Sequence, residues 1–454
     1  MKRRNFMKSA AIGTAGVSLW NTATSPTDAR AQVSGGKYYT FQNINRKWFL
    51  VSPEGKPAYL RGANHYGDGT HMPWNLKQRY GTVKAWRESV RDRHREWGFN
   101  YLPPSIGPSY IKPGPGDDPE KDIVARTPEW SAAHFAELEY PFTAFLEVPK
   151  QYMAGQDLPD VFSQEFRDMV DNRCREFVEP LRDNPYLIGY HFCHNPPWHP
   201  VVPSFIWWIE NTVKKGQPGR KRWVLLMRQI YGSVDRWRKT YGMPIKSFDE
   251  ILELSSPLRD YVSAVDGMRD QLAFMERICE EWYKVYSGTI RKYDQNHLLL
   301  GDRNTLHLHP LATHAVRRMQ SYVDCICVNV MGNSDVAYKE LEQVTPYWDG
   351  PIHLADTGAN VYQGGKIKSG FTTGDYQEFE DLYQSLMQAG LDHPQIIGTG
   401  WCGYYESAGR GGIVHVEDDS PVTERVEVMK KWNFWMEEQY ARKFRESVRL
   451  DKMG

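Results

Sequence analysis

The chain has 454 residues, and its 56 Lys and Arg residues equal its 56 Asp and Glu residues in number. This balance provides no long-range field that would favour nucleic acid or an anionic membrane, and a mean hydropathy of -0.62 excludes an integral membrane protein. The six cysteines contain no CxxC pair and are too sparse for a disulfide scaffold. The partner of this protein must therefore be inferred from local features.

Residues 1–31 have the pattern of an export signal. A basic stretch that begins with Arg3 and Arg4 precedes an apolar run from Ala10 to Trp20, and small residues follow near position 31. The apolar run is too short to cross a bilayer. The paired arginines predict recognition by the twin-arginine export machinery, and hence a bacterial periplasmic or extracellular protein without membrane insertion.

The remaining chain, 32–454, has the pattern of one α/β domain. A β-hairpin is expected within residues 37–57. After it, short apolar runs alternate with amphipathic stretches, as in parallel strands connected by helices, and eight such runs favour a closed (β/α)8 TIM barrel. The expected strands are 58–63, 100–103, 142–146, 187–192, 298–301, 325–329, 352–356 and 396–401.

Helices are expected between these strands and after the last one. Their ranges are 83–96, 164–181, 268–292, 336–344, 375–389 and 423–444. The connection between the fourth and fifth strands is longer than one crossover needs, so residues of about 200–265 are expected to form a helical insertion, with helices over 221–241 and 248–254. Insertions at this end of a barrel commonly shape the substrate cleft.

Polar and aromatic residues follow the expected strands. In a barrel these positions meet at one mouth, so they are the candidate site. The candidate binding residues are Arg61, Asn64, His65, Asn195, Trp198, Asn329, Trp401 and Glu406, and the candidate catalytic residues are Asp356, Glu147 and His194. Each carboxylate could instead pair with an arginine such as Arg61 or Arg303.

Four phrases of the sequence resemble a known group of enzymes. They are YLRGANH at 59–65, WGFN at 97–100, PDVF at 159–162 and NPYLIGY at 184–190. Together with the hairpin they resemble clan A glycoside hydrolases, nearest to the beta-agarase family, glycoside hydrolase family fifty. The resemblance covers most of residues 32–454 and implies a barrel enzyme that cleaves a beta-linked glycan, with an oligosaccharide or polysaccharide as its partner.

The chain departs from the family pattern at both catalytic positions. The family's general acid/base Glu follows an Asn at the end of the fourth strand, whereas here Pro196 follows Asn195, although Trp198 is kept. The family's nucleophilic Glu corresponds to Asp356, and the resemblance places Trp401 under a sugar ring. Because proline transfers no proton, any activity requires a different partner for Asp356.

The second catalytic group remains open at the level of sequence. Retaining glycosidases hold two carboxyls about 5 to 5.5 Å apart, and inverting ones about 6.5 to 9.5 Å apart. Glu147 is favoured as the partner of Asp356, and Asp302, Asp68 and Glu406 are alternatives. A histidine could also act as the general acid, for which His194 is best placed.

Two other functions fit the same residues. A barrel that lost its acid could bind a glycan without cleaving it. Clustered histidines could alternatively bind a divalent metal in a sugar-modifying enzyme, with His191, His194, His307 and His309 as the candidate ligands, although imidazoles also commonly hydrogen-bond to sugar hydroxyls. The sequence predicts no other cofactor and no nucleic-acid partner.

Overall fold

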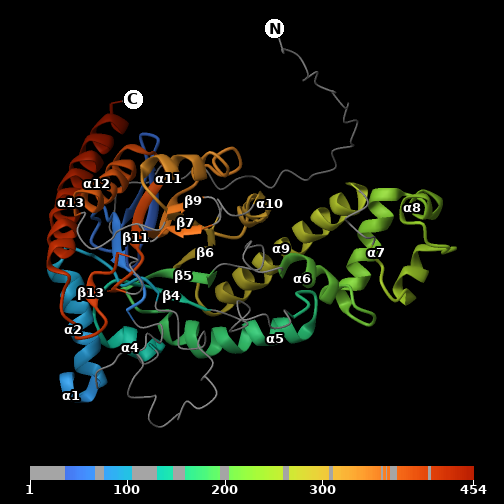
Figure 1. The fold of residues 1–454 in the computed structure, drawn as a ribbon, viewed down its shortest axis with the longest axis horizontal. Coiled ribbons are helices and arrows are strands. Elements are labelled where there is room, and N and C mark those ends of the chain that lie inside the picture. The colour runs from blue at the N-terminus through green and yellow to red at the C-terminus, as the bar shows by residue number, and fades with distance from the viewer. Residues whose placement is uncertain are drawn as a thin grey trace, which may run out of the picture. The chain divides into compact units, whose positions relative to one another are not determined.

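A computed structural model describes residues 36–66, 76–104, 130–146, 159–194, 204–258, 265–305, 310–358, 361–363, 366–368, 376–406 and 411–453 (Figure 1). These residues belong to one compact unit that begins at Gly35. Among the helices described, none is both long and apolar enough to cross a membrane.

The first elements form an antiparallel pair, β1 (Thr40–Ile44) and β2 (Lys47–Val51). The two residues of the turn, Asn45 and Arg46, have φ values of 49° and 63°, as a tight hairpin turn requires. Phe49 of β2 packs against Tyr440 and Phe444 of the last helix, α13 (Thr423–Asp451). The hairpin is thereby fixed to the helical layer.

Seven parallel strands form the central sheet. They are β3 (Leu60–Ala63), β4 (Phe142–Phe145), β5 (Leu187–His194), β6 (Leu298–Thr305), β7 (Ile326–Met331), β8 (Ile352–Gly358) and β11 (Ile396–Trp401). Their order is β3-β11-β8-β7-β6-β5-β4, so the last strand returns to pair with the first. A sheet that runs in chain order and brings its last strand back to its first has the topology of an α/β barrel.

The expected strand over 100–103 is reduced to a single bridge. Leu102 pairs with Phe142 of β4, and its N–H donates to the Pro141 carbonyl at 2.8 Å. The Asn100 N–H donates to the Arg61 carbonyl of β3 at 2.9 Å, so this segment contacts both edge strands. Two prolines follow directly at 103 and 104, and because proline has no N–H to donate, a longer ladder cannot form.

Small and apolar side chains fill the interior enclosed by the strands. Leu60, Ile188, Leu300, Ala355 and Ile397 form one buried cluster there, together with Cys325 and Cys327. Both cysteines are free and buried. At Gly189 the backbone of β6 comes so close that an added methyl would lie 2.3 Å from the Leu298 carbonyl oxygen, so no larger residue fits.

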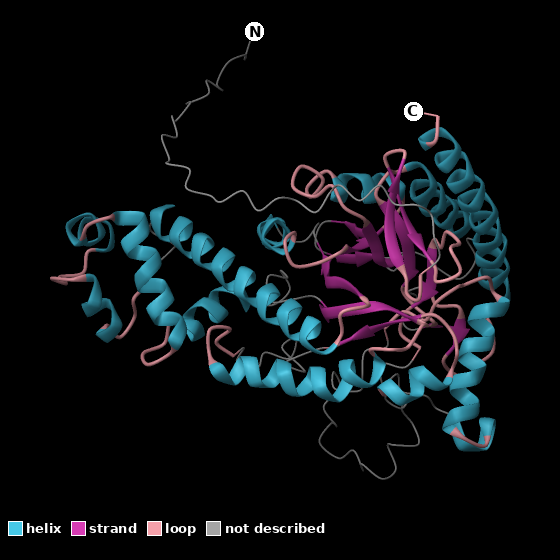
Figure 2. Cartoon of the chain, turned by 180° about the vertical axis from the view of Figure 1, so that it is seen from behind, coloured by secondary structure: helices cyan, strands magenta, loops and turns pink. Residues whose placement is uncertain are grey.

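Helices surround the sheet, as Figure 2 shows. Those that cover it are α2 (Val83–Glu96), α5 (Gln164–Arg173), α9 (Val265–Tyr293), α10 (Pro310–Met319), α11 (Ser334–Leu341), α12 (Tyr376–Asp392) and α13. Thr82, Ser163 and Asn333 cap α2, α5 and α11 by accepting a backbone N–H three residues later. The expected helix over 164–181 changes after Arg173 into a π turn and then a 3-10 turn that contains Pro180.

The insertion after β5 is helical, with α6 (Ser204–Thr212), α7 (Pro218–Tyr231), α8 (Val234–Tyr241) and a 3-10 helix at Phe248–Glu253. The single helix expected over 221–241 is wrong, because Gly232 adopts a left-handed φ of 69° and Ser233 caps a new helix. Trp223 of α7 packs edge-on against Phe274 of α9, 5.2 Å between ring centroids. The described insertion helices therefore pack on α9, away from the strands in Figure 2.

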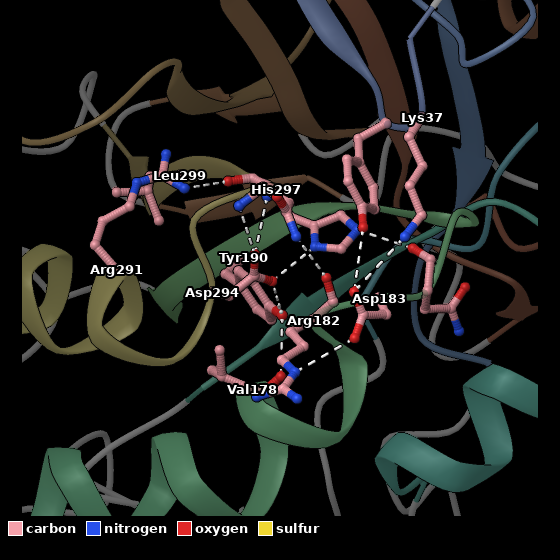
Figure 3. A network of polar contacts seen from close by, with 12 residues as sticks. Lys37, Val178, Arg182, Asp183, Tyr190, Arg291, Asp294, His297 and Leu299 are labelled. Carbon is pink, nitrogen blue, oxygen red and sulfur yellow. Dashed lines mark hydrogen bonds and ion pairs between the residues drawn. The ribbon is translucent and has the colours of Figure 1, made fainter.

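A polar network fixes the amino ends of β5 and β6 (Figure 3). Tyr190 Oη donates to Asp294 Oδ2 at 2.8 Å, and His297 Nδ1 lies 2.6 Å from the same oxygen. The other nitrogen of His297 is 2.8 Å from the Asn184 carbonyl. This histidine is bonded on both sides at the end of the sheet opposite to the candidate site, so its role is structural.

Candidate active site

Asp356 lies near the carboxyl end of β8 and is 4% exposed. Its Oδ2 is 3.0 Å from Nη2 of Arg303, which comes from β6. Its Oδ1 accepts a hydrogen bond of 3.0 Å from Nδ2 of Asn64, and His65 Nε2 lies 4.0 Å from Oδ2. A guanidinium, an amide and an imidazole thus surround this carboxylate, and among the described residues in contact with it there is no second carboxylate.

The backbone holds Asn64 in place directly after β3. Its N–H donates to the Trp401 carbonyl at 2.7 Å, and its own carbonyl accepts from the Tyr404 N–H at 2.6 Å. Its side-chain amide also donates to the Ala355 carbonyl at 3.0 Å. His65 follows with a φ of 64°, a left-handed conformation that non-glycine residues adopt at a cost, and its side chain keeps 24% exposure. The end of β3 is therefore shaped to direct two side chains at Asp356.

Arg303 is fully buried beside this carboxylate. Its guanidinium carbon lies 5.6 Å from the centre of the Phe145 ring, on β4. Among the described residues, its Nε and Nη1 atoms have no hydrogen-bond partner. Arg303 therefore compensates the charge of Asp356 through Nη2, while its Nε and Nη1 donors have no acceptor among the described residues.

Two further histidines lie in the interior below this ion pair. His191 of β5 is fully buried, and its ring centre is 6.3 Å from that of His353 on β8. His353 Nε2 is 3.1 Å from the hydroxyl of Tyr101, and its Nδ1 is 3.9 Å from Sγ of Cys327 on β7. Burial, and then the nearby Arg303 charge, lower the pKa of His191 well below its usual value and that of His353 to about 3, so both rings are neutral.

His194 and Asn329 lie at the same end of the sheet. His194 ends β5, pairs in register with Arg303 and has its ring 6.1 Å from Phe145. Asn329 of β7 is buried and pairs in register with Asp356. Both residues therefore lie on strands next to the Arg303–Asp356 pair.

Arg61, expected in the same site, lies elsewhere. Its Nε donates to the Gly98 carbonyl at 3.1 Å, and its Nη2 is 3.2 Å from Oε2 of Glu437 on α13. Because side chains alternate along a strand, Arg61 takes the face opposite to Leu60, which lies in the interior cluster. Arg61 thus joins β3 to the helical layer and is no part of the cluster at Asp356.

Glu406, another expected site residue, is paired with Arg425 of α13, which also donates to the Gly412 carbonyl at 2.8 Å. It too is separate from the contacts of Asp356. Several other expected residues lie outside the described part of the chain. These are Asp68, Glu147, Asn195, Pro196, Trp198, His307 and His309.

Trp401 is a core residue in this structure. It is 1% exposed, its Nε1 donates to the Gly411 carbonyl at 2.8 Å, and its ring packs edge-on against Phe379 and Tyr383 of α12. A ring enclosed in this way has no free face for a sugar. The role assigned to Trp401 by the family resemblance therefore has no support in its surroundings.

Trp401→Phe is expected to lower the free energy of unfolding by about 1–3 kcal/mol, because the Gly411 carbonyl loses its donor and part of the packing against α12 is lost. Urea denaturation would measure the change. Trp432→Phe, on the half-buried surface of α13, is the matched control and should cost less. An equal loss in both variants would contradict this account of Trp401.

Asp302, considered above as a second carboxyl, lies on the helical side of β6. It is fully buried beside Trp282 and Tyr283 of α9. Burial raises the pKa of this carboxyl to about 8, against smaller opposing effects of those two side chains. At neutral pH it is therefore predominantly protonated, and it faces away from Asp356.

The raised pKa of Asp302 predicts a pH dependence of stability. Between the unfolded pKa of about 3.9 and the folded pKa, the folded protein holds a proton that the unfolded chain releases, so stability falls as pH rises, by at most about 1.4 kcal/mol per pH unit. Above about pH 8 the folded protein releases this proton as well, so the stability that the proton provides is lost. Urea denaturation between about pH 5 and pH 8 should show a flatter dependence for Asp302→Asn than for the wild type. If the unfolding free energies of the two proteins change equally with pH, the folded wild type does not hold a proton on Asp302.

Two residues of the cluster escaped the sequence analysis. Phe145 contacts Arg303, His191 and His194, yet an apolar residue inside a strand gives no functional signal. Cys402 follows β11, and its thiol lies with His65 and Asp356 in a group whose potential ligand atoms are within 4.8 Å of one another. Burial, and then the Asp356 charge, raise the pKa of this thiol. The position of Cys402 directly after a strand was the sequence signal that could have identified it.

Comparison with known proteins supports the fold. Neither protein-family models nor curated proteins give a match. Among solved structures, an exo-beta-agarase has a TM-score of 0.70 at 18% identity, covering 90% of this chain and 66% of that one. PfGH50B has a TM-score of 0.69 at 19% identity, and the match covers 90% of this chain and 67% of PfGH50B. The agarase AgWH50C has a TM-score of 0.68 at 18% identity, and the match covers 91% of this chain and 67% of that one.

The chain therefore spans about two thirds of the length of these structures. The structural neighbours also include a beta-galactosidase. At such low identity the likeness shows the fold alone, which is an α/β barrel of the type found in glycoside hydrolases. The particular relationship to agarases remains one of shared architecture.

Proposed function

We propose that this protein is an exported glycoside hydrolase-like enzyme that acts on a beta-linked, agarase- or galactoside-like glycan. The observation that carries the proposal is the buried Asp356 carboxylate, held at the carboxyl end of β8 by Arg303, Asn64 and His65. The carboxyl ends of barrel strands are where such enzymes carry their catalytic groups. The export signal inferred for residues 1–31 fits an extracellular or periplasmic polysaccharide substrate.

The proposed chemistry assigns Asp356 as nucleophile or base and a second group as proton donor. His194 and Glu147 are the two candidates. His194 ends β5, the strand after which the family carries its acid, and it lies next to Arg303 in register. In this proposal a protonated His194, or else Glu147, protonates the leaving oxygen as the carbon–oxygen bond breaks.

Arg303 supports a second candidate function, which is glycan binding without cleavage. An arginine bound directly to the only carboxylate of the described cluster lowers its strength as a nucleophile, and Pro196 occupies the position of the family acid. His65, whose side chain keeps 24% exposure beside Asp356, could then bind a hydroxyl group of a sugar.

The two functions differ in whether any product forms. The purified protein should be incubated with agarose, other beta-galactans and their oligosaccharides, and products should be followed by mass spectrometry while binding is measured by calorimetry. Shortened oligosaccharides support the hydrolase. Binding without products supports the second function, and the absence of both on every beta-linked glycan would contradict each of them.

A further inference from the structure

Three potential metal ligands meet inside the strand barrel, below the Arg303–Asp356 pair. His191 comes from β5, Cys327 from β7 and His353 from β8, and one ligand atom from each lies within 4.8 Å of the others. All three residues are fully buried or nearly so. His353 pairs in register with Cys327, so two of the ligands are fixed side by side by the sheet.

His191 is the unusual member of this group. Among the residues that the structure describes, neither of its ring nitrogens has a hydrogen-bond partner, although the ring is completely buried. Leaving a buried polar atom without a partner is costly, so such atoms are rare in folded proteins. An apolar residue would fill the same space without this cost. The free nitrogens therefore point to a ligand that binds between these side chains.

We propose that His191, Cys327 and His353 bind a single thiophilic metal ion. Two imidazole nitrogens and one thiolate form a ligand set that suits copper or zinc rather than magnesium or calcium. Because these metals bind sulfur and nitrogen at about 2.0 to 2.3 Å, the ligand atoms would have to come to about 3.5 to 4 Å from one another, which small side-chain rotations provide. On binding, the Cys327 thiol loses its proton to solvent as the metal–sulfur bond forms.

Tyr101 supports a specific orientation of His353. Its hydroxyl is 3.1 Å from Nε2, which leaves Nδ1, 3.9 Å from the Cys327 sulfur, as the metal-binding nitrogen. Metal-bound histidines usually donate their second N–H to an oxygen in this way, which fixes the tautomer. Tyr101 is thus a positioning residue for the site.

Charge favours a monovalent ion. Arg303 and Asp356 neutralise each other, and an imidazole binds a metal in its neutral form. A Cu(I) ion with the Cys327 thiolate adds no net charge to the buried interior, whereas Zn(II) leaves one uncompensated positive charge near Arg303. Cu(I) is therefore expected to bind more tightly than Zn(II).

A second group, His65, Asp356 and Cys402, also has its potential ligand atoms within 4.8 Å of one another. Its carboxylate already binds Arg303 and Asn64, so a metal there would have to break existing contacts. The inner group has the opposite property, because His191 gains partners when a metal binds.

The experiment titrates Cu(I), and separately Zn(II), into the reduced, metal-free protein in competition with a coloured chelator. One equivalent of Cu(I) should bind, and Cys327→Ser should weaken binding at least about 100-fold. Cys174→Ser, which removes a buried thiol in the helical layer, should bind like the wild type. Zn(II) binding that depends on Cys327 would also support the site. No stoichiometric binding of either ion, or equal binding by Cys327→Ser, would overturn it.

Folding is controlled by measuring circular dichroism and thermal melting of each variant. If Cys327→Ser does not fold, X-ray absorption of the metal-loaded wild type decides instead. A first shell with one sulfur and imidazole nitrogens supports the site, and a shell without sulfur refutes it. These readouts require no glycan substrate, so they are independent of the proposed hydrolase activity.

Discussion

Asp356→Asn is expected to lower turnover, on any glycan that the wild type cleaves, by about a thousandfold or more. The substitution keeps the shape of the side chain and its contact with Asn64 but removes the charge that would attack the sugar carbon or activate a water. Turnover is measured as the rate of oligosaccharide release at saturating glycan. The effect should appear in kcat rather than in glycan affinity.

Asp302→Asn is the matched control for this experiment. It changes a buried carboxyl on the nearby strand β6, but that group is already predominantly protonated at neutral pH and faces α9. A neutral amide should therefore leave turnover close to that of the wild type. Undiminished turnover in folded Asp356→Asn would remove Asp356 from the mechanism, and equal losses in both variants would indicate a general effect of altering the interior.

The second large effect concerns stability, because Asp356 and Arg303 form a buried ion pair. Asp356→Asn alone leaves a buried guanidinium without its counter-charge, and Arg303→Met alone leaves a buried carboxylate. Each single variant should lose about 3–5 kcal/mol of unfolding free energy. The double variant removes both charges and should recover most of that loss, which urea denaturation of the four proteins would measure.

The double variant also separates a loss of activity from a loss of folding. If Asp356→Asn is too unstable to assay, the double variant Arg303→Met/Asp356→Asn provides a folded protein without the catalytic carboxylate. Additive losses in the double variant would mean that the two side chains do not interact in solution. In that case the contact between them could not be used to explain the properties of Asp356.

Strand positions were predictable because they depend on local patterns. Seven of the eight expected apolar runs are strands of one parallel sheet, and α2 has the expected bounds. Where local signals compete, the prediction was less accurate. Pro103 limits its segment to one bridge, and Gly232 divides a helix that hydrophobic periodicity alone would continue.

Site residues were harder to predict, because a position near a strand end does not determine the face of the strand. Asn64 and His65, directly after β3, do contact Asp356. Arg61 and Trp401 lie on their strands but contact the surrounding helices. Since neighbouring side chains on a strand point to opposite faces, a difference of one position separates the interior from the helical layer.

The sequence by itself determined the alternation of strands and helices and the position of Asp356 at a strand end, because both depend on residues close together in the chain. Only the tertiary structure decided which side chains meet. Arg303 pairs with Asp356 from two strands away, and His191 joins Cys327 and His353 from three different strands. Such contacts depend on the register and curvature of the sheet, which bring together residues that no local pattern relates.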